Sequence, residues 1–388
     1  MPNLRTMVTE LGTGLGMLGD GSLDEVLASR SPVMRSLSPD DWDLLSSVRR
    51  GGAYDAEFHA AWRNGRTFFE AREGLRGRRP ELVEWKGVVR AGGDEVAPVD
   101  LRIDHVYLVS CKYMSDILFN VSPAHIFDSL LVGSTARRKR GAGGDWYAEI
   151  APAQYQELFD VVRTALHDDD VSPDALPAEQ GPHGTTGGPP ALPGLELTAR
   201  SGPTTRGIVA PHATSALRGL PDLAVDLTSS HRTALGERLK SGWPGEAKAA
   251  YRELSDEVAR VSVARWHAAL AAGTHAGEAM LWRLLRMGSA PYFVLGSSAA
   301  RSLRLRIATP WDWKQLFRLV RLEIFPQPGG QPRVGWLATV RERASGQLRE
   351  VSGHVEVRWS HGRFGGPPEA KGYLDTSHHQ VPGYFPLQ

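Results

Sequence analysis

The chain has a single cysteine, Cys111, among its 388 residues, and it has no long apolar run. With one cysteine, neither an intramolecular disulfide nor a cysteine-based zinc site can form. No segment approaches the roughly 20 consecutive apolar residues that a membrane-spanning helix needs. The first residues also lack the apolar core of a secretory signal. We therefore expect a cytoplasmic protein without membrane contact.

An excess of charge of one sign is also missing. The 45 Lys and Arg residues are balanced by 44 Asp and Glu residues, so the net charge is +1 and gives no general attraction to polyanions. G-x-S-x-G, H-E-x-x-H and Walker sequences are absent, which excludes the enzyme classes built on them. The glycine-rich residues 12–16, GTGLG, have no Gly-Lys-Ser/Thr after them. We interpret them as a flexible arm and not as a phosphate loop.

The rest of the composition is that of an ordinary globular protein, 41% hydrophobic and 23% charged. Arginine greatly outnumbers lysine, and Ala, Gly and Pro are abundant, which is typical of a high-GC bacterial genome. The length allows two domains. Residues 168–210 are rich in Pro, Gly and Thr and poor in aromatics, which predicts a linker between domains at 1–167 and 211–388.

The hydrophobic pattern predicts an α+β fold. In the first half, a helix at 54–75 precedes three strands at 81–89, 98–103 and 106–112, which favours a mixed sheet flanked by helices. The second half begins with helices and continues with alternating segments that predict an antiparallel β unit. The helices are expected at 229–240, 246–272 and 275–286, and the strands at 318–325, 333–342 and 351–359.

Lys112 ends an apolar, β-branched strand, and a lysine there needs an anion nearby because burying an unpaired charge is costly. Asp100 on the preceding strand is the candidate partner. A two-residue loop between the strands turns Asp100 to the other face, whereas a three-residue loop at 104–106 puts it opposite Ser110, with Lys112 next along the same face.

This arrangement resembles the core of the PD-(D/E)xK nuclease superfamily. In that family an aspartate on one strand and a (D/E)-x-K tripeptide on the next hold Mg²⁺ and position the attacking water. The matching residues are Asp100, Ser110 and Lys112, with residues 114–131 as the following helix. The resemblance implies a restriction-endonuclease-like sheet and a Mg²⁺ or Mn²⁺ cofactor. Ser110 departs from the pattern, because serine is a poor Mg²⁺ ligand compared with a carboxylate.

Two glutamates are candidates for the missing acid. Glu84 lies in Glu84-Trp85-Lys86, on the strand expected beside Asp100. Glu73 lies on the helix expected at 54–75, near the edge of its apolar stripe, and in the family an acid on the first helix sometimes joins the metal site. The predicted catalytic residues are therefore Asp100, Lys112 and Glu84, and the predicted metal ligands are Asp100, Glu84 and Glu73.

Two basic segments are candidates for nucleic-acid contact. The first is a glycine-flanked loop, and the second is a predicted recognition hairpin at 353–375, which repeats the acid and E-x-K pattern in Glu356 and Glu369-Ala370-Lys371. The expected contact residues are Arg137, Arg138, Lys139, Arg140, Arg358, Trp359, His361 and Arg363.

The function expected from this resemblance is a metal-dependent endonuclease acting on DNA, of the restriction or anti-phage defence kind. Two alternatives remain open at this point. One is a catalytically inactive nucleic-acid-binding protein, which Ser110 favours. The other is a structural subunit of a defence complex with a protein partner, in which Asp100 and Lys112 form a buried ion pair.

Overall fold

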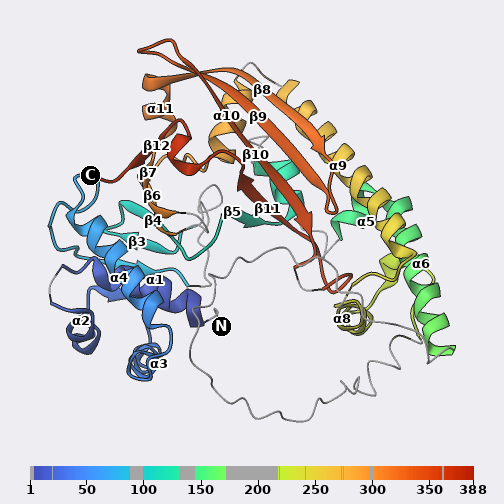
Figure 1. Cartoon of the computed structure of the whole chain (residues 1–388), viewed down its shortest axis with the longest axis horizontal. Coiled ribbons are helices and arrows are strands. Elements are labelled where there is room, and N and C mark those ends of the chain that lie inside the picture. The colour runs from blue at the N-terminus through green and yellow to red at the C-terminus, as the bar shows by residue number, and fades with distance from the viewer. Residues whose placement is uncertain are drawn as a thin grey trace, which may run out of the picture.

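The computed structural model describes residues 4–19, 21–87, 99–130, 145–171, 217, 219–240, 242–271, 273, 275–297, 301–360 and 362–388. They form an α+β fold with two sheets (Figure 1). The first is a mixed seven-stranded sheet in the order β1-β2-β3-β4-β6-β7-β12, and the second is an antiparallel five-stranded sheet in the order β5-β11-β10-β9-β8. The predicted fold class is confirmed at this level.

The strands of the seven-stranded sheet come from both ends of the chain. Their bounds are Met34–Arg35 (β1), Val83–Trp85 (β2), Leu101–Ile103 (β3), Tyr107–Lys112 (β4), Tyr292–Ser297 (β6), Ser302–Ile307 (β7) and Tyr384–Pro386 (β12). The antiparallel β2–β4 meander agrees with the prediction, and β6 joins it parallel to β4.

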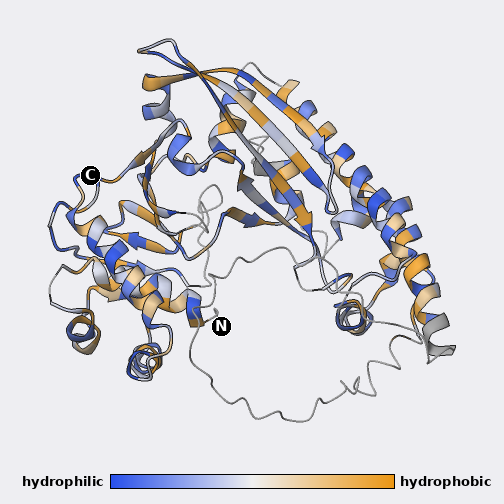
Figure 2. Ribbon diagram, viewed as in Figure 1, coloured by the Kyte–Doolittle hydropathy of each residue, from blue (hydrophilic) through white to orange (hydrophobic). Residues whose placement is uncertain are grey.

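The five-stranded sheet is made of Ile117–Val121 (β5), Phe317–Gln327 (β8), Arg333–Glu342 (β9), Leu348–Arg358 (β10) and Glu369–Leu374 (β11). Polar and apolar residues alternate along its long strands (Figure 2). The expected recognition hairpin does not protrude, because β11 lies between β10 and β5 inside the sheet. The expected helix at 114–131 is also wrong in its first half, where β5 pairs with β11.

Helices cover both sheets. Their bounds are Leu4–Gly16 (α1), Leu23–Ser29 (α2), Pro39–Arg50 (α3), Asp55–Glu70 (α4), His125–Leu130 (η1, a π-helix), Trp146–Ile150 (α5), Pro152–Val171 (α6), Ala224–Asp226 (η2), Ser229–Arg238 (α8), Ala247–Ala271 (α9), Ala276–Leu284 (α10), Pro310–Leu316 (α11) and His378–Gln380 (η3). Helices α1 and α4 pack on the seven-stranded sheet, and α9 packs on β8 and β9. None of the helices in the described parts of the chain has the length and apolar character to cross a bilayer.

The glycine-rich segment at 12–16 is part of α1, so the expectation of a flexible arm is wrong. These glycines let α1 approach α4 closely: a Cβ on Gly16 would lie 2.3 Å from the Trp62 carbonyl oxygen, and one on Gly65 would lie 2.0 Å from that of Thr13. The apolar residues Met7, Val8, Leu11 and Leu15 of the same helix are buried at helical spacing. Helix α1 is therefore a fixed part of the core.

Both sheets contain strands from both sides of the predicted linker. Strand β4 pairs with β6, and β5 pairs with β11. Helix α6 extends to Val171, so the first residues of the segment predicted as linker are helical. Residues 172–216 lie outside the described residues, as does the basic loop at 137–140.

Candidate active site at the end of the central strands

The loop between β3 and β4 decides which side chains meet. Ile103 pairs with Tyr107, so the loop has three residues, and Leu101 pairs with Val109. Asp100 therefore comes opposite Ser110, in the register that the three-residue loop requires. Asp104 and His105 adopt positive φ values of 50° and 57° in this loop, and the Asp104 carboxylate accepts hydrogen bonds from the backbone of Glu81 and Leu82. These bonds hold the loop in place.

Asp100 lies just before the first residue of β3, and its carboxylate contacts β4 directly. Its Oδ2 accepts a hydrogen bond of 2.6 Å from the backbone N–H of Cys111. Burial raises the pKa of Asp100, and the charge of Lys112 and the Cys111 N–H act in the opposite direction. Asp100 and Lys112 therefore lie close enough for their charges to interact, as the sequence predicted.

Strand β6 fixes the backbone of Lys112 on its other side. Lys112 pairs with Gly296, which has a φ of +142°, and a Cβ at that position would lie 1.8 Å from the Lys112 carbonyl oxygen. Only glycine allows this close approach without a backbone shift. The backbone N–H of Met114 then donates to Ser297 Oγ at 3.2 Å. The end of β4 is therefore held on both edges.

A second carboxylate, Glu10, reaches the site from α1. It is 7% exposed, and its Oε2 accepts a 2.6 Å hydrogen bond from Trp85 Nε1. Burial and the negative charge of Asp100 raise the pKa of Glu10 to about 8. A carboxylate with so high a pKa is held in an environment that would favour a nearby cation.

Arg286, which follows α10, completes the group. It is fully buried, and its Nη1 donates to the Leu118 carbonyl at 3.0 Å and to the Tyr292 hydroxyl at 2.9 Å. Burial and the Arg286 charge lower the pKa of Lys112 to about 8, against the attraction of Asp100. We call Glu10, Asp100, Lys112 and Arg286 the Lys112 cluster. It contains two carboxylates and two basic groups.

Lys112 and Asp100 each keep part of their surface accessible, so the cluster is not sealed. The charges of the cluster also act on His378 of η3: burial and the charges of Arg286 and Lys112 lower the pKa of this histidine to about 4. A histidine with this pKa is neutral at pH 7 and can accept or donate a hydrogen bond there.

The two glutamates predicted to replace Ser110 are engaged elsewhere. Glu84 forms ion pairs with Arg102 at 2.6 Å and with Lys86 at 3.6 Å. Glu73 accepts a hydrogen bond of 3.1 Å from the backbone N–H of Gln388. Across the described residues, no group of three or more His, Cys, Asp and Glu side chains is arranged to hold a metal ion. The second acid whose charge acts on Lys112 is Glu10.

Sequence reasoning missed Glu10 because it assigned α1 to a flexible arm. A signal was present: the apolar residues around Glu10 recur at helical spacing, and Glu10 lies among them instead of on the polar face. An acid on the buried face of a helix needs a partner or a function.

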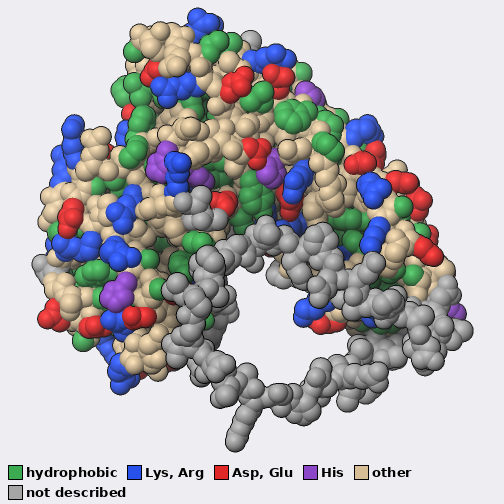
Figure 3. Space-filling model, in the orientation of Figure 1, with side chains coloured by type: hydrophobic (Ala, Val, Ile, Leu, Met, Phe, Trp, Pro, Cys, Tyr) green, Lys and Arg blue, Asp and Glu red, His purple; other side chains and the backbone are tan. Residues whose placement is uncertain are grey.

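The expected nucleic-acid contacts are only partly within the described residues, which exclude 137–140 and 361. Arg358 donates to Glu356, which Arg333 also binds, at 2.9 Å. Trp359 and Arg363 lie together in an aromatic group at the end of β10. Basic and acidic side chains are interspersed over the face shown in Figure 3, and no large area of one sign stands out.

No protein-family model, no curated protein and no solved structure matches the chain.

Proposed function

We propose that the Lys112 cluster hydrolyses phosphodiester bonds of DNA with a bound Mg²⁺ or Mn²⁺ ion. The main support is the convergence of three groups from separate elements: Asp100 before β3, Lys112 at the end of β4 and Glu10 on α1. An aspartate and a lysine on neighbouring strands, joined by an acid from the first helix, is what the nuclease resemblance implies.

The arrangement of the strands adds support. The resemblance requires a helix and a further strand after the lysine strand. Helix α10 precedes β6, and β6 lies parallel to β4 with Lys112 opposite Gly296. These two elements come far later in the chain than expected, after β5 and the long helices. The sheet around Lys112 is compatible with a restriction-endonuclease-like core that carries a long insertion.

The residues present fit a divalent cation of the Mg²⁺ type. Two carboxylates, Glu10 and Asp100, share a partly buried site. Burial raises the pKa of both, and the charge of Asp100 raises the pKa of Glu10 further. Mg²⁺ is commonly held by one or two carboxylates together with water and phosphate oxygens. Glu10 and Asp100 would hold the ion, which supplies Lewis-acid activation of phosphate and water. Ser110 is fully buried and is not needed as a ligand.

Each residue of the cluster then has a distinct role. The Lys112 ammonium donates a hydrogen bond to the attacking water or to a phosphate oxygen, which orients the nucleophile and stabilises developing negative charge. Arg286 is fully buried and acts as a positioning residue whose charge lowers the pKa of Lys112. The neutral imidazole of His378 can donate a hydrogen bond to the oxygen of the leaving group.

Cleavage of plasmid DNA by the purified protein with Mg²⁺ or Mn²⁺ tests this proposal. Asp100→Asn is expected to abolish cleavage, and Lys112→Met is expected to slow it by roughly 100-fold or more, the usual cost of losing a group that stabilises the transition state. Glu73→Gln is the matched control, since Glu73 lies outside the cluster, and it should cleave at the wild-type rate.

A balanced charge cluster supports one alternative function, a structural ion network in a nucleic-acid-binding or partner-binding protein. Breaking a buried pair typically costs about 3–5 kcal/mol. Loss of thermal stability in Asp100→Asn, together with a wild type that cuts neither DNA nor RNA with either metal, would replace the nuclease proposal by this one.

A further inference from the structure

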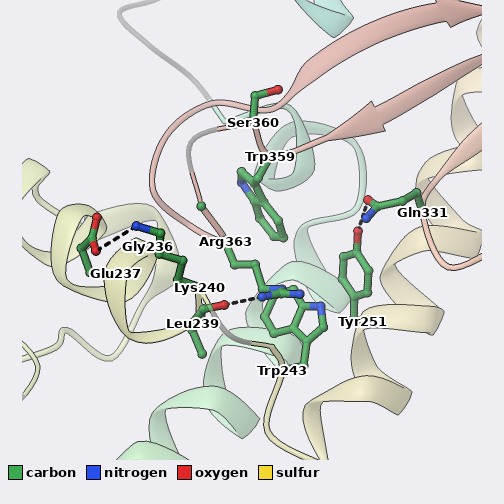
Figure 4. A pocket seen from close by; sticks show the side chains of 11 residues that line it. Gly236, Glu237, Leu239, Lys240, Trp243, Tyr251, Gln331, Trp359, Ser360 and Arg363 are labelled. Carbon is green, nitrogen blue, oxygen red and sulfur yellow. Dashed lines mark hydrogen bonds and ion pairs between the residues drawn. The ribbon is translucent and has the colours of Figure 1, made fainter. Parts of the chain in front are cut away.

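A pocket of about 550 Å³ lies at the end of β10, and none of its lining residues belongs to the Lys112 cluster. It is formed by the end of α8, the start of α9 and the loop after Arg358 (Figure 4). Its lining residues are Gly236, Glu237, Leu239, Lys240, Trp243, Tyr251, Gln331, Trp359, Ser360, Gly362 and Arg363. The volume is in the range of pockets that bind small ligands, about 300–1,000 Å³.

Three aromatic rings form one wall of this pocket. Trp243 lies 4.8 Å from Tyr251 between ring centroids, and Trp359 lies 5.9 Å from Trp243 and 6.2 Å from Tyr251. Trp243 and Trp359 are both partly exposed. Tyr251 packs on Trp243, and Phe364 packs on Trp359, so both tryptophans are held rigidly. Their exposed parts offer an aromatic surface against which a planar ring can pack.

Two basic side chains face the same space. The Arg363 guanidinium lies 4.8 Å above the Trp243 ring and donates to the Leu239 carbonyl. Burial lowers the pKa of Arg363, and Tyr251 is the group that acts in the opposite direction. The Lys240 side chain is 77% exposed, and its Nζ lies 3.7 Å from Glu237. Two basic groups with one carboxylate favour an anionic ligand.

Gln331 adds a polar group with a defined orientation. The Tyr251 hydroxyl donates to Gln331 Oε1, as the dashed line in Figure 4 shows. This bond leaves the amide nitrogen as a donor for an acceptor on a ligand. The pocket thus combines an aromatic wall, a directional donor and an anion site.

We propose that this pocket binds a nucleotide, with the base packed against the exposed parts of Trp243 and Trp359 and the phosphate between Lys240 and Arg363. Nucleotides combine a planar ring, edge acceptors and a phosphate, which are the three features that the pocket complements. The site is separate from the Lys112 cluster, so the proposal does not depend on DNA cleavage. The nucleotide can be a free mononucleotide or an unpaired unit of a single strand.

Isothermal titration in EDTA tests the proposal, with AMP, dTMP, adenosine and a short single-stranded oligothymidylate as ligands. AMP is expected to bind at least about tenfold more tightly than adenosine, because adenosine lacks the phosphate that makes charge-assisted bonds. Arg363→Gln and Lys240→Ala should each weaken AMP binding by a similar factor. The matched control is Arg321→Gln, an exposed arginine on β8 outside the pocket.

The oligothymidylate identifies the source of the nucleotide. If it binds much more tightly than dTMP, the pocket takes a unit of a strand, and if the two bind equally, it takes a free nucleotide. The proposal is overturned if none of AMP, dTMP and the oligonucleotide binds. It is also overturned if binding is unchanged in Lys240→Ala, whose exposed side chain can be removed without disturbing the fold, and in folded Arg363→Gln. If the protein cleaves DNA but binds none of these nucleotides, the nucleotide proposal is refuted and the nuclease proposal is not.

Discussion

Glu10 provides the most direct test of the Lys112 cluster, because its burial has a measurable effect on stability. Its pKa is raised from 4.5 to about 8. Between these two pH values the unfolded chain releases the Glu10 proton and the folded chain keeps it, so the free energy of unfolding falls as pH rises. Replacing Glu10 by Gln removes this loss, and the amide oxygen can still accept the hydrogen bond from Trp85.

The size of the effect follows from the two pKa values. A difference of about 3.5 pH units corresponds to about 5 kcal/mol at 1.36 kcal/mol per unit. Asp100 titrates together with Glu10, so we expect roughly half of this, about 2–3 kcal/mol, to be assignable to Glu10. Glu10→Gln should therefore resemble the wild type at pH 4.5 and exceed its free energy of unfolding by that amount at pH 8.

Urea denaturation in EDTA at pH 4.5, 6 and 8 measures this difference, with Glu73→Gln as the control carboxylate variant. A stability difference that stays constant with pH would refute the assignment of a raised pKa to Glu10. Repeating the series with saturating Mg²⁺ adds a second reading. The ion should stabilise the wild type at pH 8 by binding the ionised carboxylates and should stabilise Glu10→Gln less.

Three further predictions concern the backbone, the lysine and the chain connection. Gly296→Ala should lower the free energy of unfolding by at least about 2 kcal/mol, because the added Cβ would collide with the Lys112 carbonyl oxygen. In the same denaturation assay the control Gly288→Ala, whose added Cβ would have no atom within 4 Å, should stay within about 0.5 kcal/mol of the wild type. With saturating Mg²⁺, the DNA cleavage rate should fall above pH 8 as Lys112 loses its proton, and a rate that rises from pH 8 to pH 9.5 would exclude a cationic role. Proteolytic cleavage within 172–216 should leave two fragments that elute together in size-exclusion chromatography, since β4–β6 and β5–β11 pair across the segment, and separation of the fragments would contradict this.

The local elements were predictable where the hydrophobic pattern was long and regular. Strand β9 has the predicted bounds, and helix α9 differs by one residue at each end. The short strands β2 and β3 carry a weaker signal, because three residues give little periodicity. The glycines of α1 misled the prediction, since a residue that breaks an isolated helix is favoured where two helices pack closely.

By itself, the sequence determined that Lys112 at the end of its strand needs an anion, and the two registers open to Asp100 and Lys112. The loop between β3 and β4 decides between these registers. Hydrogen bonds from the backbone N–H groups of Glu81 and Leu82 to the Asp104 carboxylate hold this loop in its three-residue form. Only the tertiary structure decided that Glu10, and not Glu84, is the acid beside Asp100. The physical reason is that contacts between residues 75–90 positions apart along the chain depend on how α1 packs against the sheet, and no local pattern encodes that packing.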